Sequence, residues 1–191
     1  ICACLVGSEM CIRDRAIGVY GNNTKVIGCN FVSNKVKPTS NHEAYGGAIQ
    51  IGRDEYNLCS YVVNCSFINY GAIGRNLNNS HGGAGCVRAG IIYQNCKFIN
   101  NSAGQGGALT YHASGSIEDC VFINNSAKLY GGALSTGYID GDMELIVVNC
   151  NFEQNNAPYG GAVQLKGKNI EIHKSIFNKN IAAINGGAIN I

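Results

Sequence analysis

Residues 96–108 read CKFINNSAGQGGA, and residues 120–133 read CVFINNSAKLYGGA. Both stretches place a Cys two residues before a Phe, an Asn three residues after it, and a Gly-Gly-Ala shortly beyond. The six Phe residues of the chain are Phe31, Phe67, Phe98, Phe122, Phe152 and Phe177, and Gly-Gly pairs begin at residues 46, 82, 106, 131, 160 and 186. The shortest spacing between copies is 24 or 25 residues. Repetition at such a period predicts a solenoid in which each repeat forms one coil.

Apolar alternation predicts short strands within each repeat. Cys and Phe are two residues apart, and the residue between them is mostly polar. This alternation predicts a strand from which the Cys and Phe side chains both point inward. Another apolar residue, such as Val62 or Tyr93, lies three positions before the Cys, and this offset requires a bend between two strands. A third apolar pair follows Gly-Gly-Ala, as in Leu109 and Tyr111. We therefore predict an all-β, right-handed parallel β-helix with three short strands per coil and about six coils.

Stacked coils would bring like residues of successive repeats into register about 4.8 Å apart. An inward Asn at a corner can bond backbone groups of its neighbours, and in-register Cys side chains point in parallel, which disfavours disulfide geometry. We expect buried ladders of the six Phe residues, of the free thiols Cys29, Cys65, Cys96, Cys120 and Cys150, and of Asn101, Asn125, Asn155 and Asn180. Cys59 and Cys86 lie outside the ladder, and the sequence leaves open whether they are exposed or paired.

The composition restricts the classes of partner. Only 14% of the residues are charged, and the formal net charge of +2 comes without a block of Lys or Arg. This pattern argues against a nucleic-acid partner or an anionic membrane surface. No apolar stretch approaches the roughly 20 residues of a membrane-spanning helix. The 26 Gly residues, with many Asn, indicate tight corners that need left-handed backbone.

The first fifteen residues do not fit the repeat. Residues 5–14 read LVGSEMCIRD, which resembles a translated sequencing adapter, and we assign residues 1–15 to a non-native leader. The alternative is a short native strand that leads into the first coil. Residues 16–191 are assigned to one β-helix fragment cut at both ends. Because open terminal coils expose strand edges, we expect self-association.

Two irregular repeats suggest a ligand-binding surface. The interval from Phe to Gly-Gly is 15 residues in the first two copies and 8 or 9 in the last four. Both insertions should leave the same corner of adjacent coils, and solenoid insertions often gather on a binding face. The candidate ligand-binding residues are Lys35, Lys37, His42, Tyr45, Arg75 and Asn78. Tolerated variation in loop length is the alternative explanation.

The pattern Phe-x-x-Asn followed by Gly-Gly-Ala resembles the repeat of chlamydial polymorphic outer-membrane proteins. The fuller pattern Cys-x-Phe-x-x-Asn-x-Ala also resembles the adhesin-like surface proteins of methanogenic archaea. The resemblance covers about residues 24–191, and the chain departs from it at Tyr70, Gly85 and Ser175. It implies a surface-exposed, adhesive protein with an extracellular or cell-surface location. It implies no catalytic residues.

Residues capable of other chemistry are scattered. The four His residues show no metal-ligand spacing and are expected at the surface. The run from Asp140 to Glu144 is expected to be a solvated turn rather than a calcium loop. Asp54, Arg53, Arg75 and Arg88 occupy different repeat positions, so no catalytic carboxylate pair is expected. We predict no catalytic residues, no cofactor and no metal.

Three functions remain in view. The first is a non-catalytic adhesin-like surface protein that attaches to glycans or proteins of other cells. A polysaccharide lyase or glycoside hydrolase on the same scaffold is the second, and a passive surface stalk is the third. Five Asn-x-Ser/Thr sequons add a possible modification, with Asn78 as the best acceptor if the chain meets a glycosylation machinery.

Overall fold

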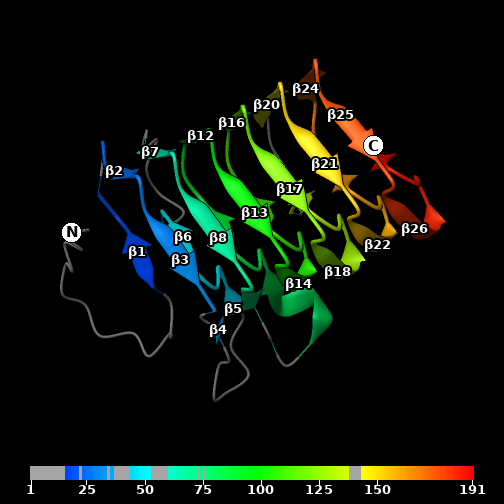
Figure 1. Cartoon of the computed structure of the whole chain (residues 1–191), viewed down its shortest axis with the longest axis horizontal. Helices are drawn as coiled ribbons and strands as arrows, with labels where there is room; N and C mark the ends of the chain where they lie inside the picture. Colours follow the sequence, from blue (N-terminus) through cyan, green and yellow to red (C-terminus); the bar gives the residue numbers. More distant parts are fainter. Residues whose placement is uncertain are drawn as a thin grey trace.

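The computed structural model describes residues 16–21, 23–33, 35–36, 44–52, 60–72, 74, 76–137 and 143–191, with Lys35 described by its backbone alone. Short strands stack along one axis from the N-terminal to the C-terminal end (Figure 1). The strands of neighbouring coils pair in parallel, and the chain is a parallel β-helix. The prediction for residues 1–15 lies outside the described residues.

Two of the four sheets hold the first and last strands of a coil. Sheet B contains β2 (Lys25–Ile27), β7 (Ser60–Val63), β12 (Ile91–Gln94), β16 (Gly115–Glu118), β20 (Glu144–Val148) and β24 (Asn169–His173). Sheet A contains β1 (Ile17–Val19), β6 (Ile49–Ile51), β11 (Gly85–Val87), β15 (Leu109–Tyr111), β19 (Leu134–Thr136), β23 (Val163–Gln164) and β27 (Ile189–Asn190).

The other two sheets lie between them along each coil. Sheet C contains β3 (Asn30–Val32), β8 (Ser66–Ile68), β13 (Lys97–Ile99), β17 (Val121–Ile123), β21 (Asn151–Glu153) and β25 (Ile176–Asn178). Sheet D contains β4 (Lys35–Val36), β5 (Ala44–Tyr45), β9 (Gly71–Ala72), β10 (Ser80–His81), β14 (Ser102–Gln105), β18 (Ser126–Tyr130), β22 (Asn156–Tyr159) and β26 (Ile181–Asn185). Each coil runs through sheets B, C, D and A in that order.

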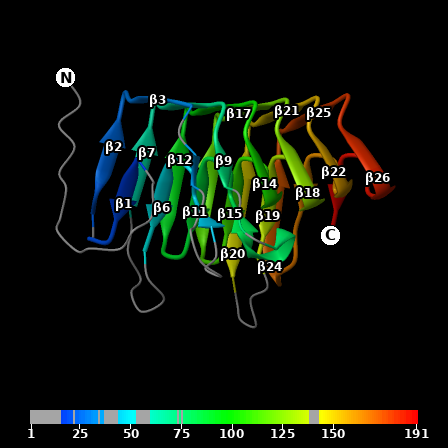
Figure 2. The ribbon, with the colours of Figure 1, turned by 90° about the horizontal axis from the view of Figure 1, so that it is seen from below.

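A full coil therefore has four strands, and the prediction of three was wrong. The missed strand is the one in sheet D, which crosses the interval between Phe and Gly-Gly (Figure 2). In β14 it reads SAGQ, and its small residues carry no alternation of large apolar and polar side chains. The number of coils agrees with the prediction, because sheet C has six strands.

Left-handed residues turn the chain at three corners of each coil. Asn95, with φ 50°, separates sheets B and C, and Asn100, with φ 56°, separates sheets C and D. Gly106, with φ 57°, separates sheets D and A. A Cβ atom on Gly106 would overlap the carbonyl oxygen of Leu109, so this corner needs Gly for space as well as for backbone conformation. The abundance of Asn and Gly in the sequence has this physical cause.

The six Phe residues form a continuous stack inside the solenoid. Neighbouring ring centroids lie 4.7–5.0 Å apart, and the ring planes are within 7° of parallel. Phe67, Phe98, Phe122 and Phe152 are fully buried, whereas Phe177 in the last coil is partly buried. The Tyr93 ring makes T-shaped contacts with Phe67 and Phe98. The stack is the one that the repeat predicts.

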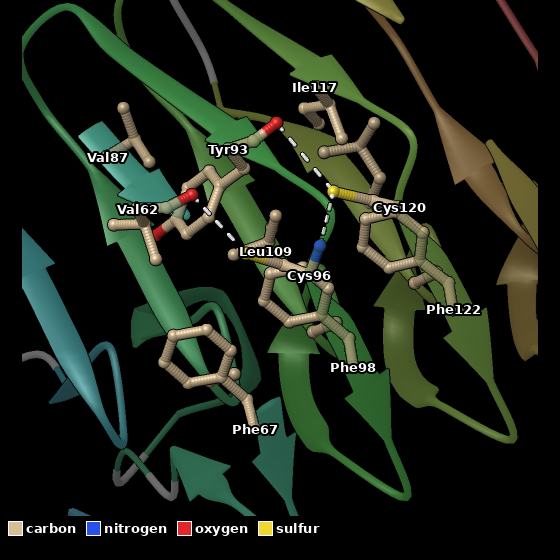
Figure 3. Packing of buried hydrophobic residues seen from close by; sticks show 14 of the residues in the cluster. Val62, Phe67, Val87, Tyr93, Cys96, Phe98, Leu109, Ile117, Cys120 and Phe122 are labelled. Carbon is tan, nitrogen blue, oxygen red and sulfur yellow. Dashed lines mark hydrogen bonds between the residues drawn. The ribbon is translucent and has the colours of Figure 1, made fainter. Parts of the chain in front are cut away.

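The Cys ladder lies at the bend between sheets B and C (Figure 3). The backbone N–H of Cys96 donates to Sγ of Cys120 at 3.4 Å, and Sγ of Cys96 lies 3.3 Å from the carbonyl oxygens of Gln94 and Val62. Burial, with hydrogen bonds to the thiols of Cys150 and Cys96, raises the pKa of Cys120 far above its ordinary value. The Cys120 thiol therefore stays protonated.

The oxidation state follows the prediction except at one end of the ladder. Cys65, Cys96, Cys120 and Cys150 are buried free thiols. The prediction was wrong for Cys29, which is disulfide-bonded. Cys86, which the sequence left open, is buried and not disulfide-bonded, and Cys59 lies outside the described residues. In the sixth coil Ser175 replaces Cys, and its Oγ still accepts from the N–H of Cys150 at 3.1 Å.

Candidate functional site

The two long insertions leave sheet D side by side. Before the insertions, Lys35 pairs with Gly71 and Val36 with Ala72, and after them Ala44 pairs with Ser80 and Tyr45 with His81. The insertions were predicted at a shared corner, but they interrupt the sheet D strand of the first two coils. The third coil carries only a register shift between Ala103 and Gln105 at this point. A site that tolerates a bulge in one coil accepts a loop in another.

The second insertion folds over the next coil. It contains the 3-10 turn η1 (Leu77–Asn79), which contacts β14 and β18. Nε2 of Gln105 donates to the carbonyl oxygen of Asn78 at 3.1 Å. The N–H of Gly74 donates to Oγ of Ser80 at 2.6 Å, which fixes the base of the loop. A Cβ atom on Gly104 would overlap the carbonyl oxygen of Leu77, so β14 admits the loop because residue 104 is Gly.

The predicted ligand-binding residues divide into those described and those outside the description. Lys37, His42 and Arg75 lie outside the described residues, as does the side chain of Lys35. Asn78 is exposed on η1. Tyr45 is only 8% exposed, because its ring stacks on a neighbouring imidazole rather than facing solvent.

Two in-register rows of side chains flank the Gly-Gly pairs, and the region between them is called the D–A corner below. The D ladder comprises the residues directly before each Gly-Gly: Tyr45, His81, Gln105, Tyr130, Tyr159 and Asn185. The A ladder comprises the outward residues of sheet A: Gln50, Cys86, Thr110, Ser135, Gln164 and Asn190. Oγ1 of Thr110 donates to the carbonyl oxygen of Gln105 at 2.9 Å, so the rows meet across the corner.

The N-terminal half of the corner is closed and rich in basic groups. The rings of Tyr45 and His81 stack with centroids 5.2 Å apart, and the His112 ring meets His81 edge-on at 5.2 Å. The guanidinium of Arg88 lies 4.9 Å from the centre of the Tyr45 ring. All four side chains come from different strands or strand ends, and stacking of the coils brings them together.

His81 is 7% exposed, so the expectation of a surface position was wrong for this residue. Burial, followed by the positive charges of His112 and Arg88, lowers the pKa of His81 to about 4. The imidazole is therefore neutral at physiological pH. Its Nδ1 has no hydrogen-bond partner, and neither has Oε1 of Gln50, which is 2% exposed. Sequence reasoning missed His81 because its burial depends on the loop and on the neighbouring coils.

The C-terminal half of the corner is open. Tyr130 and Tyr159 are both partly exposed, and their ring centroids lie 5.5 Å apart with the planes inclined by 39°. Opposite them on the A ladder, Nδ2 of Asn190 donates to Oε1 of Gln164 at 2.5 Å. This half offers aromatic faces, amides and a hydroxyl. Sequence reasoning missed these tyrosines, because they occupy the position before Gly-Gly, which varies from repeat to repeat.

Within the described ranges, no three His, Cys, Asp or Glu side chains come together as metal ligands, and residues 140–142 of the acidic run lie outside these ranges. A shallow depression on the outer face of sheet B is lined by Asn23, Lys25, Ile27, Tyr61 and Val63. Nζ of Lys25 lies 5.8 Å from the centre of the Tyr61 ring there.

Comparison with known protein families gives a match in the fourth repeat. Residues 119–137 match the model of the Chlamydia polymorphic membrane protein repeat. This stretch is similar to one such repeat. It includes β17, β18 and β19, and thus one Phe of the stack, one Asn of the ladder and one Gly-Gly corner. No curated protein and no solved structure matches the chain.

The match confirms the resemblance to the chlamydial repeat, whereas similarity to methanogen surface proteins stays a prediction. The polymorphic membrane protein repeat is typical of outer-membrane and surface proteins, which supports a surface location in general terms. Within the described ranges, no helix has the length and apolar character needed to cross a membrane.

Proposed function

We propose that this chain is a non-catalytic, adhesin-like segment of a cell-surface protein that attaches to glycans or proteins of other cells. The observation that carries the proposal is the pairing of β4 with β9 and of β5 with β10, which places two insertions side by side within sheet D, next to the D–A corner. Similarity to a chlamydial polymorphic membrane protein repeat in the same chain supports a surface role.

The rigidity of the scaffold favours binding through many weak contacts. Each coil is held to the next by backbone hydrogen bonds and by the Phe stack, so the outer side chains are already ordered before a ligand arrives. A preordered surface loses less conformational entropy on binding than a flexible one. Two adjacent loops on such a surface form a natural binding edge.

A carbohydrate-active enzyme is the competing function. Glycoside hydrolysis commonly uses two carboxylates on either side of the scissile bond. Neither the D ladder nor the A ladder contains a carboxylate. The acidic residues of segments 37–43 and 53–59 lie outside the described residues, so turnover must be measured directly.

The test removes the two loops while keeping the coils. Deleting residues 37–43 and 73–79 reduces both long intervals from 15 residues to the 8 residues of the third coil. We expect the purified chain to give signals on a glycan array or on immobilised cell-surface proteins, and the double deletion to abolish them. Retained signals after both deletions would reject the insertions as the binding edge.

A matched control shortens a different insertion. Deleting residues 138–142, between β19 and β20, gives the span from Thr136 to Leu145 the length of the paired span from Tyr111 to Gly115 in the preceding coil. This variant should bind like the parent. Incubation with polygalacturonate and alginate, with and without calcium, tests catalysis, and formation of unsaturated or shortened products would establish an enzyme. Absence of both binding and turnover would favour the passive stalk.

A further inference from the structure

We propose that the open half of the D–A corner binds an uncharged glycan, whose sugar rings stack on Tyr130 and Tyr159. This inference rests on the proposed function and assigns it a ligand class and a location. It concerns a part of the corner beyond the two insertions, formed by residues that the repeat motif leaves variable.

The first argument is the arrangement of the aromatic faces. Tyr130 and Tyr159 are in register on the adjacent strands β18 and β22, so the pair follows the solenoid axis (Figure 2). Each ring is partly exposed, and the centroid separation of 5.5 Å exceeds that of every pair in the buried Phe stack. The apolar faces of sugar rings pack on aromatic faces of this kind, and Tyr combines an apolar face with a polar hydroxyl.

The second argument is the polar frame around the pair. Asn185 follows Tyr159 on the D ladder and is exposed, whereas Gln105, which precedes Tyr130, is buried and bonded to Asn78. Across the corner, Gln164 and Asn190 of the A ladder are partly exposed. Amide and hydroxyl groups both donate and accept hydrogen bonds, as the hydroxyl groups of a sugar require. None of these side chains is charged, which favours a neutral ligand over an acidic one.

The length of the surface is also defined. At one end η1 covers β14, and Leu77 of η1 is itself 50% exposed beside β18. From there the ladder continues through Tyr130 and Tyr159 to Asn185 on β26. A short run of sugars laid along the axis fits this span, because successive coils present one side chain each.

The experiment titrates the purified chain with cellohexaose, xylohexaose and chitohexaose as neutral probes and with hexagalacturonate as an acidic probe. Binding is followed by calorimetry and by ligand-observed magnetic resonance. We expect at least one neutral hexasaccharide to bind and hexagalacturonate to bind more weakly. Equal or tighter binding of hexagalacturonate would overturn the assignment of an uncharged ligand, and failure of all three neutral probes would overturn the glycan assignment.

Substitutions locate the binding. Tyr130→Ala and Tyr159→Ala should each weaken binding about tenfold, whereas Tyr130→Phe and Tyr159→Phe, which keep the rings, should stay within about threefold of the parent. Tyr61→Ala, on the outer face of sheet B, is the matched control and should have no effect. Unchanged affinity in both Tyr→Ala variants would overturn the proposal. If the loop deletions abolish attachment while these variants bind normally, the proposed function stands and this inference fails.

Discussion

Oδ1 of Asn125 accepts two hydrogen bonds from Asn101, one from its backbone N–H at 3.0 Å and one from its Nδ2 at 2.9 Å. Nδ2 of Asn125 donates in turn to the carbonyl oxygen of Phe98 and to Oδ1 of Asn155, both at 3.0 Å. The side chain is nearly inaccessible to water, so protein groups satisfy its amide. One side chain therefore links its own coil to the coils on both sides.

Asn125→Ala should lower the free energy of unfolding by about 3–5 kcal/mol, because it leaves several buried polar groups without partners. The measurement is urea unfolding followed by circular dichroism. Asn178→Ala, at an exposed position of β25, should cost less than about 0.5 kcal/mol and serves as the control. A loss below about 1 kcal/mol for Asn125→Ala would mean that the ladder contributes little to stability.

The Phe stack gives a second stability prediction. Phe122 is fully buried between Phe98 at 4.8 Å and Phe152 at 4.7 Å, so Phe122→Ala should cost about 3–5 kcal/mol. Phe177 in the last coil is partly buried, and Phe177→Ala should cost about half as much. Equal costs for the two variants in urea unfolding would contradict the burial argument.

The scaffold was predictable because its residues recur at a fixed period. Phe, Cys and Asn occupy inward positions in coil after coil, so stacking imposes the same contacts each time, as between Phe98 and Phe122. The sheet D strand escaped prediction because Ser102, Ala103 and Gly104 show no apolar alternation. Its backbone hydrogen bonds to neighbouring coils, and not its own side chains, define it as a strand.

The corner site was less predictable because it depends on contacts between coils. The unequal intervals indicated where loops emerge, and the paired flanking strands agree with that. The burial of His81 results from a bulge position, a loop and neighbouring aromatic rings, none of which a single repeat encodes. Strand β18 has one residue more than β22 between its first paired residue and the tyrosine. A register shift between Ser126 and Tyr130 compensates for this difference, and only therefore does Tyr130 pair with Tyr159.

Gly104→Ala should release the second insertion without unfolding the solenoid. Its backbone conformation suits Ala, but the added Cβ would overlap the carbonyl oxygen of Leu77 and push η1 away from β14. We expect faster tryptic cleavage after Arg75, with the unfolding temperature nearly unchanged. Gly187→Ala is the control, since its Cβ would have no neighbour within 4 Å. Equal cleavage rates in the parent and Gly104→Ala would show that η1 does not depend on this contact.

Acidification should destabilise the protein through His81. Burial and the charges of His112 and Arg88 lower the pKa of this residue from 6.5 to about 4. Between these values the unfolded chain binds a proton that the folded chain does not, so stability is present above pH 6.5 and is lost as the pH falls towards 4. The loss should reach about 3 kcal/mol.

His81→Gln tests this dependence, because Gln105 occupies the same ladder position in the next coil. The variant should show a flatter profile of unfolding free energy between pH 4 and 6.5, measured by urea unfolding at each pH. His173→Gln, at an exposed position on β24, should keep the slope of the parent. If His81→Gln kept the parent's slope of unfolding free energy against pH, the acid sensitivity would belong to other groups.

Self-association is expected at the C-terminal coil. Strands β24, β25, β26 and β27 each end the strand order of their sheet, so they pair with a neighbour on one side only within the described chain. Ile176, Ile181 and Ile184 of this coil are 63%, 61% and 59% exposed. An unpaired edge with apolar side chains adds strands of another chain.

Light scattering of the purified chain should therefore show an average mass that increases with concentration. The double substitution Ile181→Lys with Ile184→Lys should reduce this increase, because charge at a strand edge opposes pairing. A monodisperse monomer at all concentrations, with or without these substitutions, would contradict the expectation.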